Sequence, residues 1–427
     1  AFGYRALLNN TTSNNSAFGF RSLFNNTIGT SNAAFGKDSL FSNTTGSTNS
    51  AFGKDALKYN TIGISNSGFG YRSLFTNTTG TYNTAVGTSA LQSNTIGTAN
   101  NAFGANALYS NTTGVNNTAV GTNALYSNTT GAYNNAVGLN SLYGNTVGTR
   151  NNAFGWYSLF ANVNGSSNTA FGHRVLQNNT TSGNTGFGYM SLFANTIGTS
   201  NVAVGAAALT SNTTGSNNTA VGVNALYTNT IGTHNVAVGF NALSSNTTGG
   251  LNTALGGNSL YSNTVGIYSV AVGYSALYSN TTGNYNNAFG FYALRNNTIG
   301  INNAAFGLSA LQSNLTGVNN SAFGSYALLN NTTGNQNVAV GYQSLKANTT
   351  GSCNVAVGKD ASFSSTFGCY NSAFGYRALY SNTTKNNTAV GLSALQNNTT
   401  GTRNNAVGVY ALLSNTIGNN NNAFGYY

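Results

Sequence analysis

The sequence predicts an all-β protein, a parallel β-solenoid (β-roll) of about 25 coils of 17 residues each. Two observations predict this fold: a short motif returns at a fixed interval along the chain, and its unit is rich in glycine and β-branched residues. Of the 427 residues, 40% are hydrophobic and only 4% are charged. This composition is too apolar for a disordered polar tract, so the chain has material for a core.

The repeat continues from one end of the sequence to the other. An Ala/Gly–Val/Phe/Leu–Gly motif starts 26 times, first at Ala1 and last at Ala423. Of the 25 intervals, 22 are 17 residues long and three are 16 residues long, beginning at Ala1, Ala170 and Ala373. No linker interrupts them, so we expect residues 1–427 to form a single repeat array. Because the chain begins and ends inside the motif, we expect it to be a fragment of a longer repetitive protein.

The unit is numbered here from its first alanine, so that position 3 is always Gly and position 13 usually is. Position 2 is Val, Phe or Leu; position 7 is Leu in all complete units but one, which has Ser362; position 10 is Asn except at Ser365. Seventeen residues are too few for a pair of helices but suit two short strands. We predict strands at segments such as "NTAV" and "ALYSNT". Positions 2, 7 and, in many coils, 12 should point inward, and both glycines should adopt φ values that other residues avoid.

Stacking such coils brings equivalent residues together at the spacing of adjacent strands. The asparagine at position 10 should then form a ladder of side-chain amides, each hydrogen-bonded to the next coil. This ladder would satisfy amides that lack other partners at a turn. Its members in the first third of the chain are Asn43, Asn60, Asn77, Asn94, Asn111, Asn128 and Asn145.

The segments Asn151–Gly155, Asn201–Gly205 and Asn218–Gly222 ("NNAFG", "NVAVG", "NTAVG") resemble the N-S-V-A-I-G repeat of YadA-like trimeric autotransporter adhesin heads. The "A-L-x-S-N-T-T-G" part is similar to repeats of related bacterial surface and tail-fibre proteins. The resemblance covers the whole chain, although the family's coils are shorter and its Asn stands one residue further from the Gly. It implies a left-handed β-roll, a homotrimer and a role in surface attachment. It assigns no functional residue to this sequence.

Aromatic residues recur at position 8, which should point outward if position 7 points inward. Three explanations remain open for this column: a subunit interface, stacking of carbohydrate or another ligand, and simple stacking between coils. Position 4 carries further rings, among them Trp156 and Tyr189. The aromatic residues at position 8 within residues 1–160 are Phe24, Phe41, Phe75, Tyr109, Tyr126, Tyr143 and Phe160.

Glycosylation sequons arise wherever position 12 is threonine, because position 10 is then the Asn of Asn-x-Thr. The same Asn is present in coils that have isoleucine at position 12, so its first role should be structural, with sugar attachment as an added possibility. The candidate attachment sites are Asn43, Asn77, Asn111 and Asn128.

Two cysteines, Cys353 and Cys369, fall in successive coils at positions 15 and 14. Stacking should bring them within reach of a disulfide, which would suit an extracellular protein. The only carboxylates, Asp38, Asp55 and Asp360, each follow a lysine, and we expect exposed charge pairs rather than acid–base catalysis.

Several function classes find no support in the residues. Fourteen basic and three acidic residues give a charge of +11, but the basic residues are scattered and form no nucleic-acid footprint. Metal-ligand spacings, nucleotide motifs and an apolar run long enough to span a membrane are missing. We therefore expect no enzyme activity and no cofactor.

The predicted function is structural. We expect an extracellular fibre or adhesin at a cell surface or in a virion, which presents a repetitive surface and self-associates as a homotrimer or filament, with a host surface or glycan as a further partner. The alternatives are a filament or spacer without ligand, and an ice-binding β-solenoid that uses its threonine columns.

Overall fold

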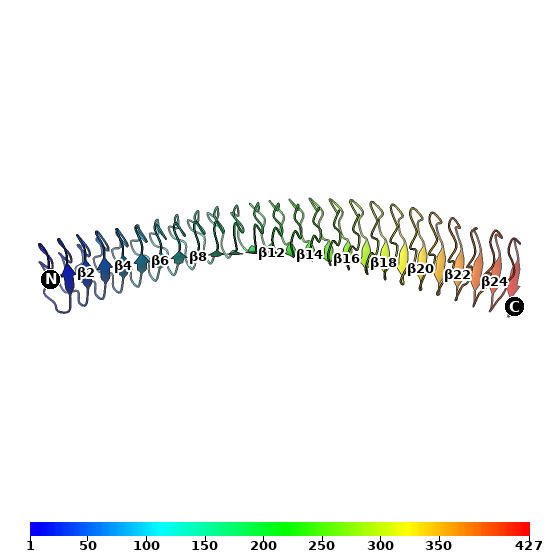
Figure 1. The fold of residues 1–427 in the computed structure, drawn as a ribbon, viewed down its shortest axis with the longest axis horizontal. Helices are drawn as coiled ribbons and strands as arrows, with labels where there is room; N and C mark the ends of the chain where they lie inside the picture. The colour runs from blue at the N-terminus through cyan, green and yellow to red at the C-terminus, as the bar shows by residue number, and fades with distance from the viewer. The chain divides into compact units, whose positions relative to one another are not determined.

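The computed structural model describes residues 1–427 and contains no helix. It confirms the predicted parallel β-solenoid: the chain winds in successive coils, and each coil adds one short strand to a parallel sheet (Figure 1). Two compact units, residues 1–214 and 215–427, are distinguished. Each unit is described by itself below.

All strands are three residues long and end at position 2 of their coil. In residues 1–214 they are β1 Ser16–Phe18, β2 Ala33–Phe35, β3 Ser50–Phe52, β4 Ser67–Phe69, β5 Thr84–Val86, β6 Asn101–Phe103, β7 Thr118–Val120, β8 Asn135–Val137, β9 Asn152–Phe154, β10 Thr169–Phe171, β11 Thr185–Phe187 and β12 Val202–Val204. In residues 215–427 they are β13 Thr219–Val221, β14 Val236–Val238, β15 Thr253–Leu255, β16 Val270–Val272, β17 Asn287–Phe289, β18 Ala304–Phe306, β19 Ser321–Phe323, β20 Val338–Val340, β21 Val355–Val357, β22 Ser372–Phe374, β23 Thr388–Val390, β24 Asn405–Val407 and β25 Asn422–Phe424.

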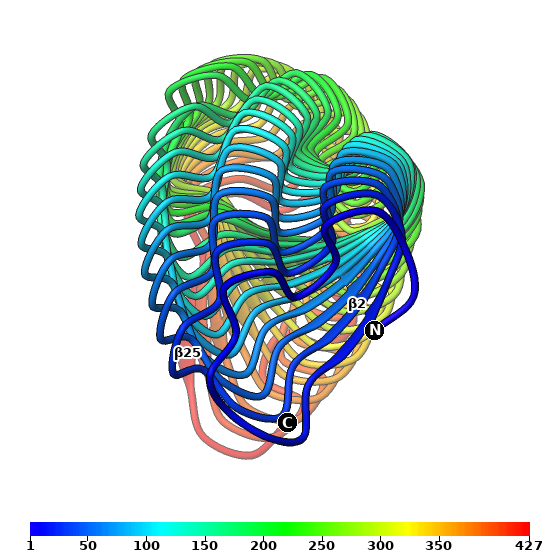
Figure 2. The ribbon, with the colours of Figure 1, turned by 90° about the vertical axis from the view of Figure 1, so that its left-hand side faces the viewer.

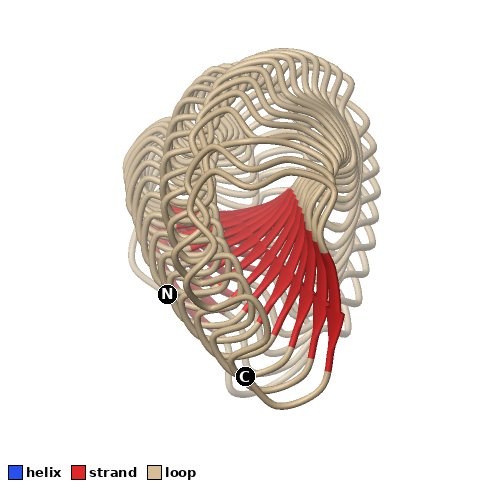
Figure 3. Ribbon diagram, turned by 90° about the vertical axis from the view of Figure 1, so that its right-hand side faces the viewer, coloured by secondary structure: helices blue, strands red, loops and turns tan.

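Within each unit every strand pairs in parallel with the strand of the next coil, and identical positions face each other. Ala85 of β5, for example, pairs with Ala102 of β6, which pairs with Ala119 of β7. The strands occupy one side of the coil, and turns make up the rest (Figure 3). The turns of neighbouring coils also follow one another in register (Figure 2). A residue type at one position therefore becomes a column along the stack.

The core is built from small and medium-sized side chains. The alanine at position 1, the alanine or serine at position 6 and the leucine at position 7 are fully buried in almost every coil. Where position 6 is serine, its hydroxyl in most coils donates back to the coil's own backbone, as Ser39 does to the Gly36 carbonyl at 3.0 Å. This bond explains why alanine and serine alternate freely at a buried position.

The structure corrects the predicted strands and two of the predicted inward positions. The "ALYSNT" segment is a turn, so each coil has one strand rather than two. At position 2 Phe18 is 51% exposed, and at position 12 Ile96 is 53% exposed. The physical reason at position 2 is the alternation of a strand: position 1 points inward, so its neighbour points outward. Alanine and leucine supply most of the apolar side chains in the narrow interior.

The buried leucine at position 7 has an unusual backbone conformation. Its φ is close to +50°, as in Leu91 and Leu108, a region that bulky L-residues normally avoid. Hydrogen bonds hold it there: the Leu91 amide donates to the Ala107 carbonyl of the next coil at 2.9 Å, and the Asn94 amide donates to the Leu91 carbonyl at 3.2 Å. The turn thus reverses the chain while its backbone groups stay paired and the side chain fills the core.

The predicted asparagine ladder at position 10 is confirmed. The side chains are fully buried, and each amide donates to the carbonyl oxygen of the preceding coil's Asn, as Asn94 does to Asn77 at 2.8 Å. The same amide donates to the carbonyl of the glycine at position 13, in this coil Gly97, at 3.0 Å. The ladder therefore joins neighbouring coils and also closes the turn within each coil.

A second ladder, which the sequence analysis missed, runs along position 16. Asn83 donates from its backbone and its side-chain amide to Asn66 of the preceding coil, at 3.0 and 3.1 Å. Its side chain also donates to the carbonyl of Gly97 in the following coil at 2.8 Å. The position-13 carbonyl thus accepts from both ladders.

The two glycines are required for different reasons. At position 3 φ lies between +124° and +138°, as predicted. At position 13 φ is not positive, so that part of the prediction was wrong. A Cβ on Gly97 would instead lie 2.5 Å from the Gly114 carbonyl oxygen and would also meet the Asn94 side chain. Close packing of coils and ladder, rather than backbone conformation, excludes other residues there.

One coil interrupts both the core column and the first ladder. Ser362 stands at position 7 and Ser365 at position 10, and the hydroxyls of both are buried without a hydrogen-bond partner. The side-chain oxygen of Asn348, which would accept from an asparagine at 365, is also unpartnered. Residues 356–372 are therefore the weakest point of the ladder within the compact unit of residues 215–427.

We predict that Asn111→Ala lowers the free energy of unfolding by about 3 kcal/mol, because it leaves buried polar groups of the neighbouring coils unpaired. The Asn111 amide donates to Asn94 and Gly114, and its oxygen accepts from Asn128. Urea unfolding followed by circular dichroism measures the loss. Asn101→Ala is the control, since this exposed strand residue should change stability by less than about 0.5 kcal/mol. Equal effects would contradict a structural role for the ladder.

We also predict that Ser365→Asn stabilises the chain by about 1 kcal/mol, because it restores the donor that Asn348 lacks. The same urea titration should show a higher midpoint. Ser364→Asn adds the same side chain at position 9, where Asn25 stands in another coil, and should leave the midpoint unchanged. An unchanged or lower midpoint for Ser365→Asn would show that the broken ladder is not the weak point.

Candidate interaction surfaces

The strand face is formed by positions 17 and 2 of each coil, on either side of the inward alanine, and combines a mostly polar column at position 17 with an apolar column at position 2. Its position-2 column consists of Val, Phe or Leu in every coil, and neither position carries a charged residue anywhere. The column remains partly open to solvent even at valines, with Val86 37% exposed. Successive phenylalanines stack, Phe35 on Phe52 with centroids 4.7 Å apart. This surface was not predicted from the sequence, because the hydrophobicity of position 2 indicates a core residue.

The aromatic column at position 8 is less exposed than predicted. The seven rings singled out from the sequence are all half-buried. Adjacent rings stack in parallel between coils: Tyr126 lies 5.1 Å from both Tyr109 and Tyr143. Three explanations were open for this column, and the ring positions agree with stacking between coils. Such pairs contribute to cohesion of the coils.

Ionisation of the middle tyrosine is disfavoured by this packing. Burial raises the pKa of Tyr126 above its ordinary value, and the neighbouring Tyr109 and Tyr143 phenols raise it further. Burial acts because it removes water from the phenolate, and the neighbours act because their own charges would repel it.

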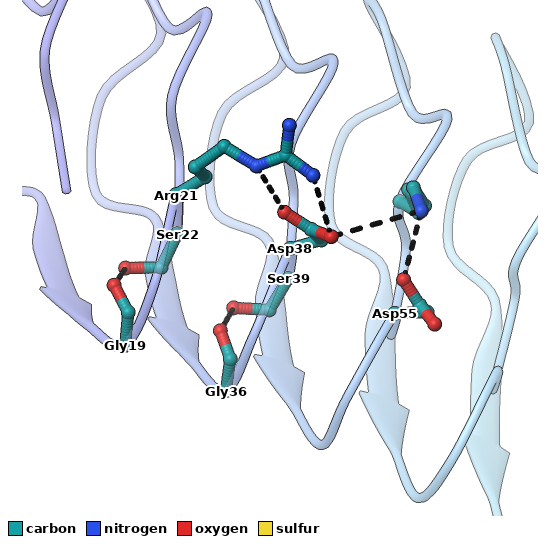
Figure 4. A network of polar contacts seen from close by, with 8 residues as sticks. Gly19, Arg21, Ser22, Gly36, Asp38, Ser39 and Asp55 are labelled. Atoms are coloured by element: carbon teal, nitrogen blue, oxygen red, sulfur yellow. Dashed lines mark hydrogen bonds and ion pairs between the residues drawn. The ribbon is translucent and has the colours of Figure 1, made fainter. Parts of the chain in front are cut away.

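Two of the three carboxylates, Asp38 and Asp55, lie inside a charge cluster rather than on the surface (Figure 4). Arg21 donates through Nε and Nη2 to the two oxygens of Asp38, at 2.8 and 2.9 Å. Lys58 Nζ lies 2.9 Å from Asp55 and 3.8 Å from Asp38. The hydrogen bond with Asp38 raises the pKa of Arg21 above its usual value. This arrangement binds three successive coils together. The third carboxylate, Asp360, is 6% exposed and lies 3.9 Å from Nε of Arg377.

The expected pairing of each aspartate with the lysine before it was therefore wrong. Lys37 and Lys54 lie over the rings of Phe20 and Tyr71, 5.7 and 5.6 Å from the ring centroids. Adjacent residues diverge in the turn, whereas equivalent residues of successive coils meet. Asp38 is consequently only 2% exposed although it sits at a turn.

The sequon asparagines have no access to solvent. Asn43, Asn77, Asn111 and Asn128 are fully buried, and each amide nitrogen donates two hydrogen bonds. A glycan on that nitrogen would replace one donor and would have no room in the folded coil. The folded chain therefore offers none of these four side chains for glycosylation.

The structure contains Cys353 and Cys369 as free thiols instead of the predicted disulfide. Their partners differ: Cys353 Sγ donates to the Gln336 side chain at 3.3 Å, and Cys369 Sγ accepts from the Ser352 amide at 3.3 Å. Both are half-buried.

The threonine column at position 11 is engaged with the chain itself. The Thr95 hydroxyl donates to the Thr112 carbonyl of the next coil at 3.0 Å, and the same bond recurs along the column. Their hydroxyl hydrogens are therefore used within the chain rather than offered to surface water.

One hollow of about 450 Å³ is lined by residues near the end of the chain, from Tyr410 to Tyr427. A second of about 260 Å³ lies beside Phe367 and Cys369. The third, of about 390 Å³, is lined by Trp156, Tyr157, His173 and Arg174. No three histidine, cysteine or carboxylate side chains gather as they would around a metal ion. No helix is present that is long and apolar enough to cross a membrane.

Comparison with known proteins adds no name to this geometry. No protein-family model matches the chain, and no curated protein matches it. The resemblance of its repeat to adhesin heads therefore stays a prediction. The surfaces of the solenoid, above all the strand face, are the features that bear on function.

We predict that the stability of the chain falls at alkaline pH partly through Tyr126. Its pKa is raised on folding, so its contribution is fully present below the ordinary tyrosine pKa of about 10 and is lost as pH rises through the folded pKa. Urea unfolding at several pH values, with phenolate absorbance recorded alongside, measures this decline. Tyr126→Phe should make the decline shallower, and an identical slope in the variant would contradict the assignment.

Proposed function

We propose that this chain is a non-catalytic structural module of an extracellular cell-surface or virion fibre, and that copies of it assemble side by side through the strand face. The observation that carries the proposal is the continuous, uncharged, exposed apolar column at position 2. Monomeric soluble proteins rarely leave such a surface uncovered. The aromatic column at position 8, by contrast, is already used between coils.

A second copy of the chain fits this surface better than an unrelated partner does. The strand face repeats with every coil, and a partner that makes the same contact at each coil must have the same spacing. Another copy has that spacing by construction. The twelve strands of residues 1–214 present two outward residues each, which matches the roughly twenty to thirty residues per partner of a standard interface. The absence of charge from the face also removes repulsion between chains that carry +11 each.

The homotrimer implied by the adhesin resemblance is one form that this assembly would take, and a filament is the other. Attachment to a host surface or glycan would be a second activity of such a fibre. An ice-binding solenoid is less well supported, since the hydroxyls at position 11 are hydrogen-bonded to the chain.

Light scattering of the purified chain tests the assembly. We predict a mass that is a multiple of 43.8 kDa, with three copies for the trimeric form. The variant Val86→Lys with Val120→Lys places two charges on the strand face and should give a monomer, because burial of an unpaired charge opposes association.

The matched control is Ile62→Lys with Ile96→Lys. It adds the same two charges at position 12, where the isoleucines are 52% and 53% exposed, and should leave the assembled mass unchanged. A wild-type chain that stays at 43.8 kDa over a hundredfold range of concentration would refute self-association. Equal loss of mass in both variants would place the interface elsewhere.

A further inference from the structure

The repeat also departs from its pattern around residues 153–190. This stretch contains the only tryptophan, Trp156, and the only methionine, Met190. The coil that starts at Ala170 is one of the three with 16 residues. In a repeat array each regular coil meets the same structural demands, so a local departure calls for a local cause.

Three aromatic rings lie in register at position 4 of the successive coils in this stretch. Trp156 contacts His173 edge to face, with centroids 5.1 Å apart, and His173 stacks in parallel on Tyr189 at 5.4 Å. Backbone hydrogen bonds hold the three coils in place, from the Arg174 amide to the Trp156 carbonyl and from the Met190 amide to the His173 carbonyl. The rings are therefore positioned by the rigid stack.

Two residues of this aromatic row, Trp156 and His173, line the hollow of about 390 Å³, and Tyr189 extends the row beyond it. Trp156 is 50% exposed and Tyr189 53% exposed. A volume of this size is within the range of small-molecule sites, which combine apolar walls with a few polar groups. Tyr157, tilted against Trp156 with centroids 5.5 Å apart, forms a further aromatic wall.

The cation that lines the hollow, Arg174, has no carboxylate partner within the chain. The Arg174 guanidinium lies over the Phe193 ring, 5.5 Å from its centroid, and makes no ion pair. The Nδ1 atom of His173 is buried without a hydrogen-bond partner. Guanidinium groups match carboxylates with two parallel hydrogen bonds. The site thus offers a flat aromatic surface beside an unpaired cation.

We propose that Trp156, Tyr157, His173, Arg174 and Tyr189 form a binding site for an acidic sugar, a pyranoside that carries a carboxylate. The C–H face of a pyranose is apolar and packs on the electron-rich face of an aromatic ring. In this site the main ring that contacts the sugar is Trp156. Arg174 then binds the carboxylate, and the Tyr157 hydroxyl hydrogen-bonds to a hydroxyl group of the sugar. The site is formed by positions 4 and 5 within one chain, so it does not depend on assembly through the strand face.

The single tryptophan makes the test direct, because all tryptophan fluorescence comes from Trp156. We would titrate the chain with two acidic probes, trigalacturonic acid and sialyllactose, and with two neutral counterparts, the methyl ester of the first probe and lactose. We expect a saturable change in emission with at least one acidic probe and binding about tenfold weaker for its neutral counterpart. The absence of saturable change with both acidic probes overturns the proposal, and so does equal affinity for acidic and neutral sugars.

Two variants assign the binding to the named residues. Arg174→Gln should weaken the acidic probe about tenfold and leave the neutral sugar unchanged; glutamine occurs at the same position as Gln343. Trp156→Ala should abolish binding measured by calorimetry, and alanine occurs at that position as Ala105. The matched control, Arg150→Gln, removes an exposed positive charge in the same unit. An equal loss in this control would show general charge attraction and overturn the site.

Discussion

The stack depends on one buried hydrogen-bonded junction that is repeated in almost every coil. The carbonyl of Gly97 accepts the side-chain amides of Asn94, in its own coil, and of Asn83, in the coil before. Each of these asparagines is also linked to the equivalent residue of a neighbouring coil. The junction therefore closes the turn, joins two ladders and ties coils together with groups that water never reaches. In such surroundings an unpaired amide is costly, so the residues tolerate almost no change.

The same junction explains why the coil can remain so small. Alanine and leucine supply a core only two or three side chains wide, which by itself buries little in any one coil. Stability in a solenoid comes from contacts between neighbours, and here the ladders supply polar contacts in the place of a larger apolar interior. The left-handed conformation of the leucines is held by the same stacking, because the hydrogen bonds of the turn run to adjacent coils.

Because the inner positions are constrained, variation is confined to the outward ones, and that is where functions can differ along the chain. The position-2 column is uniformly apolar, as a surface that associates along its length requires. Position 4 changes from coil to coil and brings Trp156, His173 and Tyr189 together only once. A regular face for assembly and an irregular site for a ligand are compatible on one stack, since they use different columns.

The sequence by itself determined the repeat length, the parallel solenoid and the ladder at position 10, because a residue that recurs at a fixed interval must meet its own copies when coils stack. It did not determine which side of the coil each position faces. Position 2 looked like core from its hydrophobicity, and only the tertiary structure showed that a three-residue strand with a buried alanine must turn Phe18 and Val86 outward. The same holds for Asp38, whose partner Arg21 is 17 residues away in the chain. Contacts between coils depend on the path of the turns. That path is set by the positive φ of Leu91 and of the equivalent leucines, a conformation that no side-chain preference predicts.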